Sequence, residues 1–107
     1  LNSGFGNVLR HVTFLKIQDW VNGKEGNIRA LLASLSDVLW EGAEQWQHYC
    51  MADLLSENQV KKCYHRACLL VHPDKHVGQD HEELARAIFT ELNEAWNVFV
   101  QNSRFSK

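Results

Sequence analysis

The chain has 107 residues, of which 45% are hydrophobic and 22% are charged. This length suits one domain, and the composition predicts a folded protein rather than a disordered one. The net charge of -2 argues against a dedicated nucleic-acid binder, which usually carries a clear basic excess. No apolar run approaches the roughly 20 residues of a membrane span, so none is expected. A single proline and six glycines favour long helices and an all-α fold.

The cysteines and the start of the chain bear on where the protein works. Cys50, Cys63 and Cys68 make an odd number, and the last two fall within one helical pattern. A disulfide framework is therefore not expected, and a reducing compartment is. Charged residues such as Arg10 and Lys16 interrupt every early apolar run, so no signal peptide is predicted. Because the sequence does not begin with methionine, we expect it to be a segment of a longer protein.

The first half of the chain is expected to form two helices and a connector. Residues 1–13 are poorly patterned, and a short helix is predicted over 13–21, where an Asn-Gly pair ends it. A second helix is predicted over 27–39, because its apolar residues fall within about 120° on a helical wheel. Residues 41–50 are predicted to be a connector held by aromatic side chains. Residues 51–55 are predicted to form one helical turn.

Two longer helices joined by a loop are predicted in the second half. Ser56 and Gln59 have the spacing of a capping box, which opens a helix running to residue 71. Pro73 ends that helix, because proline lacks an amide hydrogen and moves the preceding residue out of the helical conformation. The last helix is predicted from about residue 80 to about residue 101. With only a short loop between them, the two helices are expected to pack antiparallel.

The helix that ends at residue 71 has two contrasting faces. Its apolar face is formed by Val60, Cys63, Tyr64, Ala67, Leu70 and Val71. The opposite face, called the basic face below, is formed by Lys61, Lys62, His65 and Arg66. Leu69 lies near the middle of that polar side, and the pattern leaves open whether it contacts a partner or the core. Positive residues outnumber negative ones between 56 and 75 although the whole chain is acidic, which predicts a docking face for an acidic partner.

The tripeptide His72-Pro73-Asp74, called the HPD turn below, follows this helix directly. Alone it would be explained as a helix stop with an incidental histidine. The basic helix over 61–66 followed by His72-Pro73-Asp74-Lys75 resembles the second helix and loop of DnaJ-type J domains. Residues 89–96, with the sequence Phe-Thr-Glu-Leu-Asn-Glu-Ala-Trp, resemble the third helix of the same family, with tryptophan in place of the usual tyrosine. The sequence departs from the family at residues 70 and 71, where many J domains have lysine and tyrosine.

The flanking sequence narrows the resemblance. Residues 20–32 and 38–40, and the Met-Ala-Asp-Leu segment at 51–54, are similar to the helical extension before the J domain in auxilins, including the cyclin-G-associated kinase type. This resemblance implies an N-terminal extension over residues 1–45 that packs on a J domain over residues 46–107. The extension is expected to support the J domain, and whether it also contacts clathrin stays open.

The resemblance implies a co-chaperone that is not itself an enzyme and needs no cofactor or metal. It would bind the nucleotide-binding domain and linker of a 70-kDa heat-shock chaperone and stimulate its ATPase. It would recruit that chaperone to clathrin coats for uncoating, as a cytoplasmic monomer that reaches clathrin-coated vesicles through upstream clathrin-binding regions. The expected chaperone-binding residues are His72, Pro73, Asp74, Lys61, Lys62, His65, Arg66, Leu69 and Lys75.

Three other functions compete with this interpretation. A J domain that serves other clients would share everything from Ser56 onward, and only the extension distinguishes it. A small nucleic-acid-binding helical domain would use the same basic face, but the pI near 6.3 argues against it. An interaction module without a chaperone would make the HPD turn accidental. The segment Asp53-Leu54-Leu55 resembles short clathrin-binding motifs, although its place before a capped helix favours a packing role.

A metal site or a nucleophilic cysteine is the alternative from another class. Suitable ligand types are supplied by His72, His76, His81, Cys63 and Cys68. The two cysteines lie about 140° apart on their helix, so they cannot easily share one ion. No CxxC or HExxH spacing is present. A cysteine nucleophile needs a base held beside it, and the place of Cys63 on the apolar face indicates inert packing instead.

Overall fold

The computed structural model describes the backbone of residues 2–43 and 45–105, and side chains within residues 10–43 and 45–103. Its four helices are α1 (Asn2–Val21), α2 (Ile28–Ala33), α3 (Glu57–Val71) and α4 (Glu82–Phe105). Three short 3-10 turns lie between them: η1 (Leu35–Asp37), η2 (Met51–Leu54) and η3 (Pro73–Lys75). Since residues 2–43 and 45–105 contain no strand, the predicted all-α fold is confirmed. No helix in these ranges is long and apolar enough to cross a membrane.

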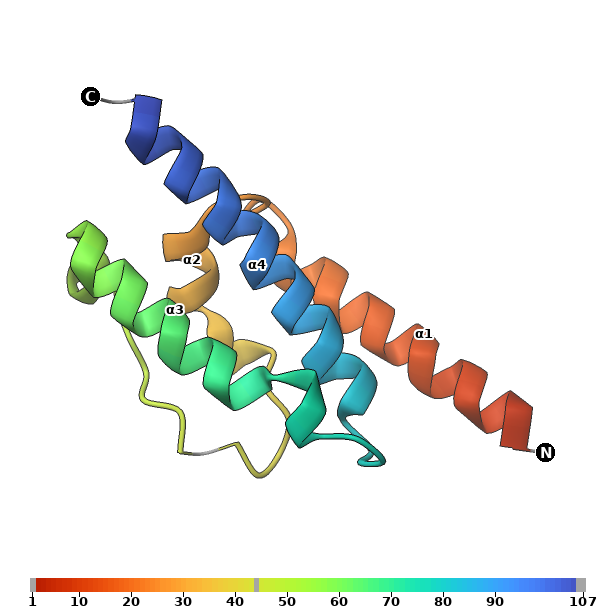
Figure 1. Ribbon diagram of the computed structural model, residues 1–107. Helices are drawn as coiled ribbons and strands as arrows, with labels where there is room; N and C mark the ends of the chain where they lie inside the picture. The colour runs from red at the N-terminus through yellow and green to blue at the C-terminus, as the bar shows by residue number, and fades with distance from the viewer. Residues whose placement is uncertain (1, 44, 106–107) are drawn as a thin grey trace.

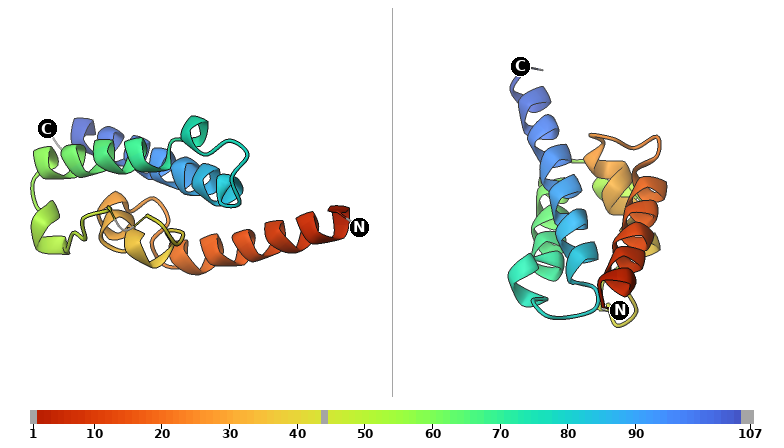
Figure 2. Two further views of the ribbon diagram at one scale, coloured as in Figure 1. Left: turned by 90° about the horizontal axis from the view of Figure 1, so that it is seen from below. Right: turned by 90° about the vertical axis from the view of Figure 1, so that its right-hand side faces the viewer.

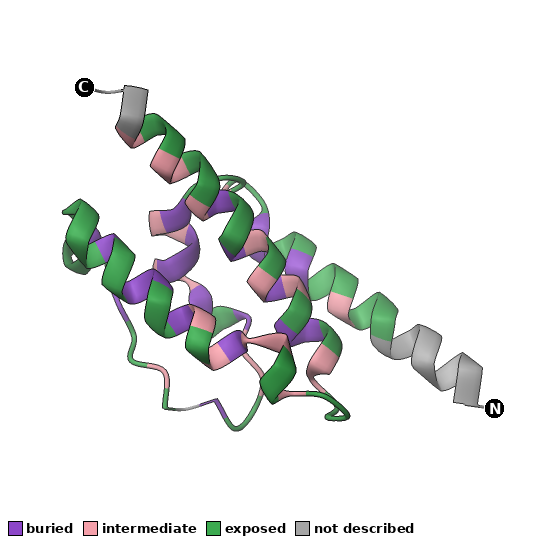
Figure 3. Ribbon diagram, in the orientation of Figure 1, coloured by how far each residue is buried: buried purple, intermediate pink, exposed green. Residues whose placement is uncertain are grey.

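The helices are arranged in two layers. α3 and α4 lie side by side and run antiparallel, as the short loop predicts, and η3 lies at the end where they are joined (Figure 1). α1 and α2 form the second layer and cover one face of this hairpin (Figure 2). Buried positions of both layers face one another (Figure 3). The largest side chains that are fully buried in this core are Leu31, Leu32, Leu35, Leu54, Ile88 and Leu92.

α3 begins and ends where its sequence signals predict. The Ser56 hydroxyl accepts a hydrogen bond from the Gln59 amide at 3.1 Å, and the Gln59 side chain accepts one from the Ser56 amide at 2.9 Å. These two bonds satisfy donors that the first turn of a helix leaves free. The helix ends at Val71, and His72 has φ -54° and ψ 123°, as expected before proline. The predicted apolar face is buried except for Leu70, which is half-buried.

The start of the chain differs from the prediction. α1 begins at Asn2 rather than near residue 13, so the irregular start predicted for residues 1–13 is wrong for the backbone of residues 2–12. The last turns of α1 bury Ile17, Trp20 and Val21 in the core. Packing of those turns removes the cost of nucleation, and a nucleated helix then extends at little cost through sequence of modest propensity. The predicted end at residue 21 is confirmed.

α2 is shorter than predicted, because the chain tightens after Ala33. Asn27 caps α2 through its side chain, as predicted, but the helix stops after six residues and η1 follows. The hydroxyl of Ser34 donates to the carbonyl of Ala30 at 2.8 Å and accepts a hydrogen bond from the Trp20 indole at 3.0 Å. The 3-10 turn keeps residues 35 and 38 on one side, so the predicted apolar stripe is buried although the helix is not continuous.

The connector is irregular, as predicted, and the turn after it has a structural role. Tyr49 is buried, and its ring lies 5.4 Å from that of Trp46. The carboxylate of Asp53 accepts a hydrogen bond from the Cys50 amide at 3.0 Å, and this bond lowers the pKa of Asp53. Leu54 is fully buried, whereas Leu55 is 74% exposed. The packing role favoured for the Asp53-Leu54-Leu55 segment is therefore confirmed for Leu54, whereas Asp53 is exposed and caps the turn.

We predict that Ser34→Ala destabilises the protein even though alanine is the better helix former. The substitution leaves the Trp20 indole N–H without its partner in a site where Trp20 is 4% exposed. Loss of this hydrogen bond should cost about 1–3 kcal/mol, against a propensity gain of at most about 0.5 kcal/mol. Urea unfolding followed by tryptophan fluorescence measures the difference. Ser36→Ala, at an exposed position two residues later, is the control and should change little. A more stable Ser34→Ala variant would contradict this explanation of why α2 ends at Ala33.

Candidate functional site

The HPD turn is a compact 3-10 turn at the end of α3. Pro73 occupies its first position, where a missing amide hydrogen costs nothing. The Nδ1 atom of His72 accepts a hydrogen bond from the Asp74 amide at 3.3 Å, so His72 caps its own turn. The carbonyl of His72 accepts a hydrogen bond from the Lys75 amide at 3.0 Å, and that of Pro73 accepts one from His76 at 3.1 Å. Each residue of the turn is therefore fixed by the backbone.

The two ionisable side chains of the turn face solvent to different extents. The Asp74 side chain is 89% exposed and that of His72 is 46% exposed. His72 Nδ1 and the nearest Asp74 oxygen are 3.8 Å apart, a distance that forms an ion pair only when the imidazole is protonated. The turn thus presents a carboxylate with nothing covering it, beside an imidazole with one edge available to a partner.

Side chains from outside the tripeptide hold the turn, and the sequence patterns alone do not reveal them. Phe89 of α4 lies edge-on to the His72 ring, with ring centroids 5.5 Å apart. The Nε2 atom of His76 lies 2.7 Å from the carbonyl oxygen of Leu70 in the last turn of α3. In the sequence, Phe89 registers only as an apolar position and His76 only as a candidate metal ligand. No spacing rule connects either of them with the turn.

The predicted basic face is fully on the surface. Lys61, Lys62, His65 and Arg66 are all exposed, and Leu69 is 62% exposed among them. Leu69 is therefore not a core residue. The distance along the helix axis from Lys62 to the HPD turn is about 15 Å. Exposed cations, one exposed leucine and the turn thus lie along a single edge of the α3–α4 hairpin.

The structure brings three of the predicted residues together around one groove. Arg66, Leu69 and Lys75 line an open groove of about 410 Å³ with residues of the connector. The guanidinium of Arg66 donates a hydrogen bond to the Tyr49 hydroxyl, which ties the basic face to the connector. The indole nitrogen of Trp46, also beside this groove, is buried and has no hydrogen-bond partner among the described residues. Lys61 and Lys62 lie toward the other end of α3, away from this groove.

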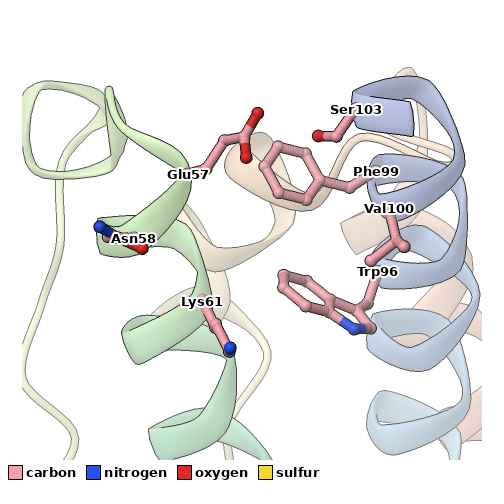
Figure 4. Close-up of a pocket in the computed structure, with 7 residues that line it drawn as sticks. All are labelled: Glu57, Asn58, Lys61, Trp96, Phe99, Val100 and Ser103. Atoms are coloured by element: carbon pink, nitrogen blue, oxygen red, sulfur yellow. The ribbon is translucent and has the colours of Figure 1, made fainter. Parts of the chain in front are cut away.

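A second groove lies at the far end of the hairpin from the HPD turn (Figure 4). It is open, has a volume of about 280 Å³, and lies between the start of α3 and the end of α4. Its lining residues are Glu57, Asn58, Lys61, Trp96, Phe99, Val100 and Ser103. Lys61 is the single member of the basic face among them. Trp96, Phe99 and Val100 of α4 give this groove an apolar side that offers surface for contact.

Cys63 is buried, Cys68 is half-buried, and two of the histidines are bonded to each other. Cys63 is buried, and burial raises the pKa of its thiol to about 12, so the reactive thiolate is scarce. Burial also raises the pKa of Cys68. Among the side chains that the structure describes, no three His, Cys, Asp or Glu residues gather closely enough to hold a metal ion. His76 and His81 are instead bonded to each other, at 2.9 Å between Nδ1 and Nε2.

Comparison with known proteins agrees with the resemblance seen in the sequence. The chain is 40% identical over 95 residues to auxilin-related protein 1 of Arabidopsis thaliana, covering 85% of the chain and 10% of that protein. It is 40% identical over 88 residues to the J domain-containing protein required for chloroplast accumulation response 1 of the same plant, covering 78% and 13%. It is 38% identical over 90 residues to the auxilin-like clathrin uncoating factor SWA2 of Saccharomyces cerevisiae, covering 80% and 13%.

The chain spans only 10% to 13% of the length of these relatives, which are therefore much longer than the matched segment. Their identity with this chain extends well beyond α3 and α4, since the matched lengths of 88 to 95 residues exceed that hairpin. The model of the DnaJ domain matches residues 51–105, which include η2, α3, the HPD turn and α4. The chain therefore belongs to the DnaJ domain family, with auxilin-like proteins among its relatives.

Proposed function

We propose that this chain is a co-chaperone domain that binds a 70-kDa heat-shock chaperone through α3 and the HPD turn and stimulates its ATPase. The observation that carries the proposal is the exposed edge on which the basic face leads directly to the 89% exposed Asp74 carboxylate. Membership of the DnaJ domain family supports it. The chain would do no chemistry itself, and its effect would come from binding one state of the chaperone better than another.

The basic face has the properties of a surface that orients a partner. Single exposed ion pairs are worth less than about 1 kcal/mol, so no one lysine holds the chaperone alone. Several cations along one helix act together, because their summed field attracts and turns an acidic surface before contact. Lys61, Lys62, His65 and Arg66 would dock first in this scheme. Leu69 would add apolar contact in the middle of the patch, and Lys75 would extend the positive field past the turn.

The HPD turn would stimulate the ATPase of the chaperone once the basic face has docked. Pro73 and the two backbone bonds of η3 hold the Asp74 carboxylate outward, so little entropy is lost when it meets a partner donor. His72 would contribute its free ring edge, while its other side packs against Phe89. The turn is thus preorganised for recognition. A cation or amide donor of the chaperone is the natural partner of such a carboxylate.

The client of this co-chaperone is the finer question. We propose recruitment of the chaperone to clathrin coats, at clathrin-coated vesicles in the cytoplasm, on the strength of the similarity to auxilin-related protein 1 and SWA2. A second candidate is service to other clients. The 40% identity to a protein named for the chloroplast accumulation response favours it, because that match also reaches beyond the hairpin.

His72→Gln is predicted to abolish most of the ATPase stimulation. Glutamine cannot place an acceptor where Nδ1 caps the turn, and it loses the ring contact with Phe89. Single-turnover ATP hydrolysis by the chaperone should show a loss of about tenfold or more in stimulation, with the helical content unchanged. His48→Gln makes the same change at an exposed histidine of the connector and should behave as wild type. No stimulation by wild type, or full stimulation by His72→Gln, would contradict the proposal.

Clathrin release distinguishes the two clients. The full-length protein that contains this segment, incubated with assembled clathrin coats, chaperone and ATP, is expected to release clathrin into the supernatant of a sedimentation assay. The full-length His72→Gln protein should leave the coats intact, because it would recruit the chaperone without activating it. If the wild-type protein stimulates the ATPase but leaves the coats assembled, the second candidate is favoured and clathrin uncoating is contradicted.

A further inference from the structure

A chain of four groups connects the N-terminal extension with the end of α3. The Trp40 ring stacks on the His81 ring, with centroids 4.3 Å apart and planes 8° apart. His81 Nε2 lies 2.9 Å from His76 Nδ1, and His76 Nε2 lies 2.7 Å from the carbonyl oxygen of Leu70. Trp40 also meets the edge of the His76 ring at 4.7 Å. The extension, the start of α4, the loop after the HPD turn and the last turn of α3 are thereby linked.

The carbonyl at the end of this chain is one of those that the end of α3 leaves without a helical partner. In a continuing α-helix the carbonyl of Leu70 would accept a hydrogen bond from the amide of Asp74. That amide instead bonds to the His72 ring, because the chain leaves the helix before Pro73. His76 supplies the replacement donor from two residues further along. The arrangement of the HPD turn therefore depends on His76 being held in place.

The hydrogen bonds fix the state of the two histidines. A carbonyl can only accept, so the Nε2 atom of His76 carries a hydrogen. In neutral His76 the Nδ1 atom is then a lone pair, which accepts from the Nε2 hydrogen of His81. One added proton on either ring still allows an N–H···N bond, with His81 changing tautomer where needed. Two added protons place two N–H groups against each other, and the bond breaks.

Charged groups around the pair come from every element that packs on it. Asp80 precedes His81, while Lys16 of α1 and Glu41 of the connector line the same groove of about 410 Å³. The loop side carries Asp74 and Lys75, both exposed. Burial and the neighbouring His76 lower the pKa of His81, although Asp80 opposes them. The pKa of His81 is therefore held below its ordinary value of 6.5.

We propose that Trp40, His81 and His76 are positioning residues for the HPD turn, through which the N-terminal extension sets how well the turn activates the chaperone. This inference rests on the proposed function, because its main readout is ATPase stimulation. Trp40 fixes the plane of His81, His81 fixes the tautomer and orientation of His76, and His76 closes the end of α3. None of the three needs to touch the chaperone. Their loss should lower the fraction of turns in the competent arrangement rather than weaken docking by the basic face.

The variants separate the hydrogen bond from the bulk of the side chain. His81→Leu removes the donor to His76 but keeps an apolar group under Trp40. His81→Gln keeps an N–H at the position of Nε2 and cannot titrate, so it should retain most of the effect. Trp40→Leu removes the stacked ring. Melting temperatures of all variants show whether each one folds, and His48→Leu at an exposed site is the control.

The decisive measurement is the dependence of single-turnover ATP hydrolysis on the concentration of this chain. His81→Leu and Trp40→Leu should lower the maximal stimulation by about threefold to tenfold, while the half-saturating concentration changes by less than about twofold. His81→Gln should retain most of the maximal stimulation. Equal maximal stimulation by wild type and folded His81→Leu would overturn the inference, and so would a pure rise in the half-saturating concentration. If wild type stimulates and His72→Gln does not, such a result would leave the proposed function standing.

A second readout does not involve the chaperone. In the protein labelled with ¹⁵N, a scalar coupling across the N–H···N bond should join His81 Nε2 to His76 Nδ1 at pH 7.5. The coupling should persist when one proton is added and disappear at the lower pH where both rings are protonated, and the Asp74 amide should shift together with its loss. His81→Gln should lack that step, because glutamine has no ring nitrogen to protonate. An Asp74 amide that shifts identically in wild type and His81→Gln would overturn the inference.

Discussion

The ring of Pro73, which keeps His72 out of the helical conformation, is the constraint on which the geometry of this end of the molecule depends. It ends α3 at Val71, forces His72 into an extended conformation and leaves the carbonyl of Leu70 without its helical partner. The Asp74 amide then turns to the His72 ring, and His76 closes the open carbonyl. In a regular helix the Leu70 carbonyl and the Asp74 amide would be bonded to each other. Because α3 ends here instead, the turn presents the outward carboxylate of Asp74 and the fixed imidazole of His72.

The rest of the fold holds that break at a fixed place. α3 and α4 pack against each other, which anchors both ends of the short loop between them. α1 and α2 cover one face of the hairpin and leave the basic face open (Figure 2). Within the covering layer, the Trp20 indole donates a hydrogen bond to Ser34. Arg29 of α2 donates one to the Leu54 carbonyl at 2.7 Å, which connects this layer with η2. The proposed docking surface is thus left exposed by the layer that covers the hairpin.

Sequence patterns predict the second half of the chain well, for physical reasons. The capping box, the apolar face and the proline stop of α3 each act within a few residues, so short-range rules describe them. The first half depends on tertiary contacts. The break at Ser34 follows from a bond to Trp20, fourteen residues away, and no local signal encodes it. α1 extends to Asn2 because its other end is packed, which residues 1–13 alone do not reveal.

The candidate site shows the same division. Its charged and exposed residues, from Lys61 to Lys75, can be read from the sequence because they lie on one helix and its loop. Phe89 and Trp40 cannot, since each lies on another element, and no local signal reveals the bond between His76 and the Leu70 carbonyl. From the sequence, His76 is a candidate metal ligand, and its role as the donor to one of the last carbonyls of α3 is not evident. Pairs of histidines bonded to each other become visible only when the loop is folded.

The most direct test of the docking site is a titration of the ¹⁵N-labelled chain with the nucleotide-binding domain and linker of the chaperone, followed by amide chemical shifts. The account predicts that the largest changes lie on the exposed edge of α3 and in the HPD turn, with the amide of Asp74 among them. Residues of α1, on the covering layer, should change little. Changes centred on α1, or on the groove beside Phe99, with the turn unaffected, would contradict it.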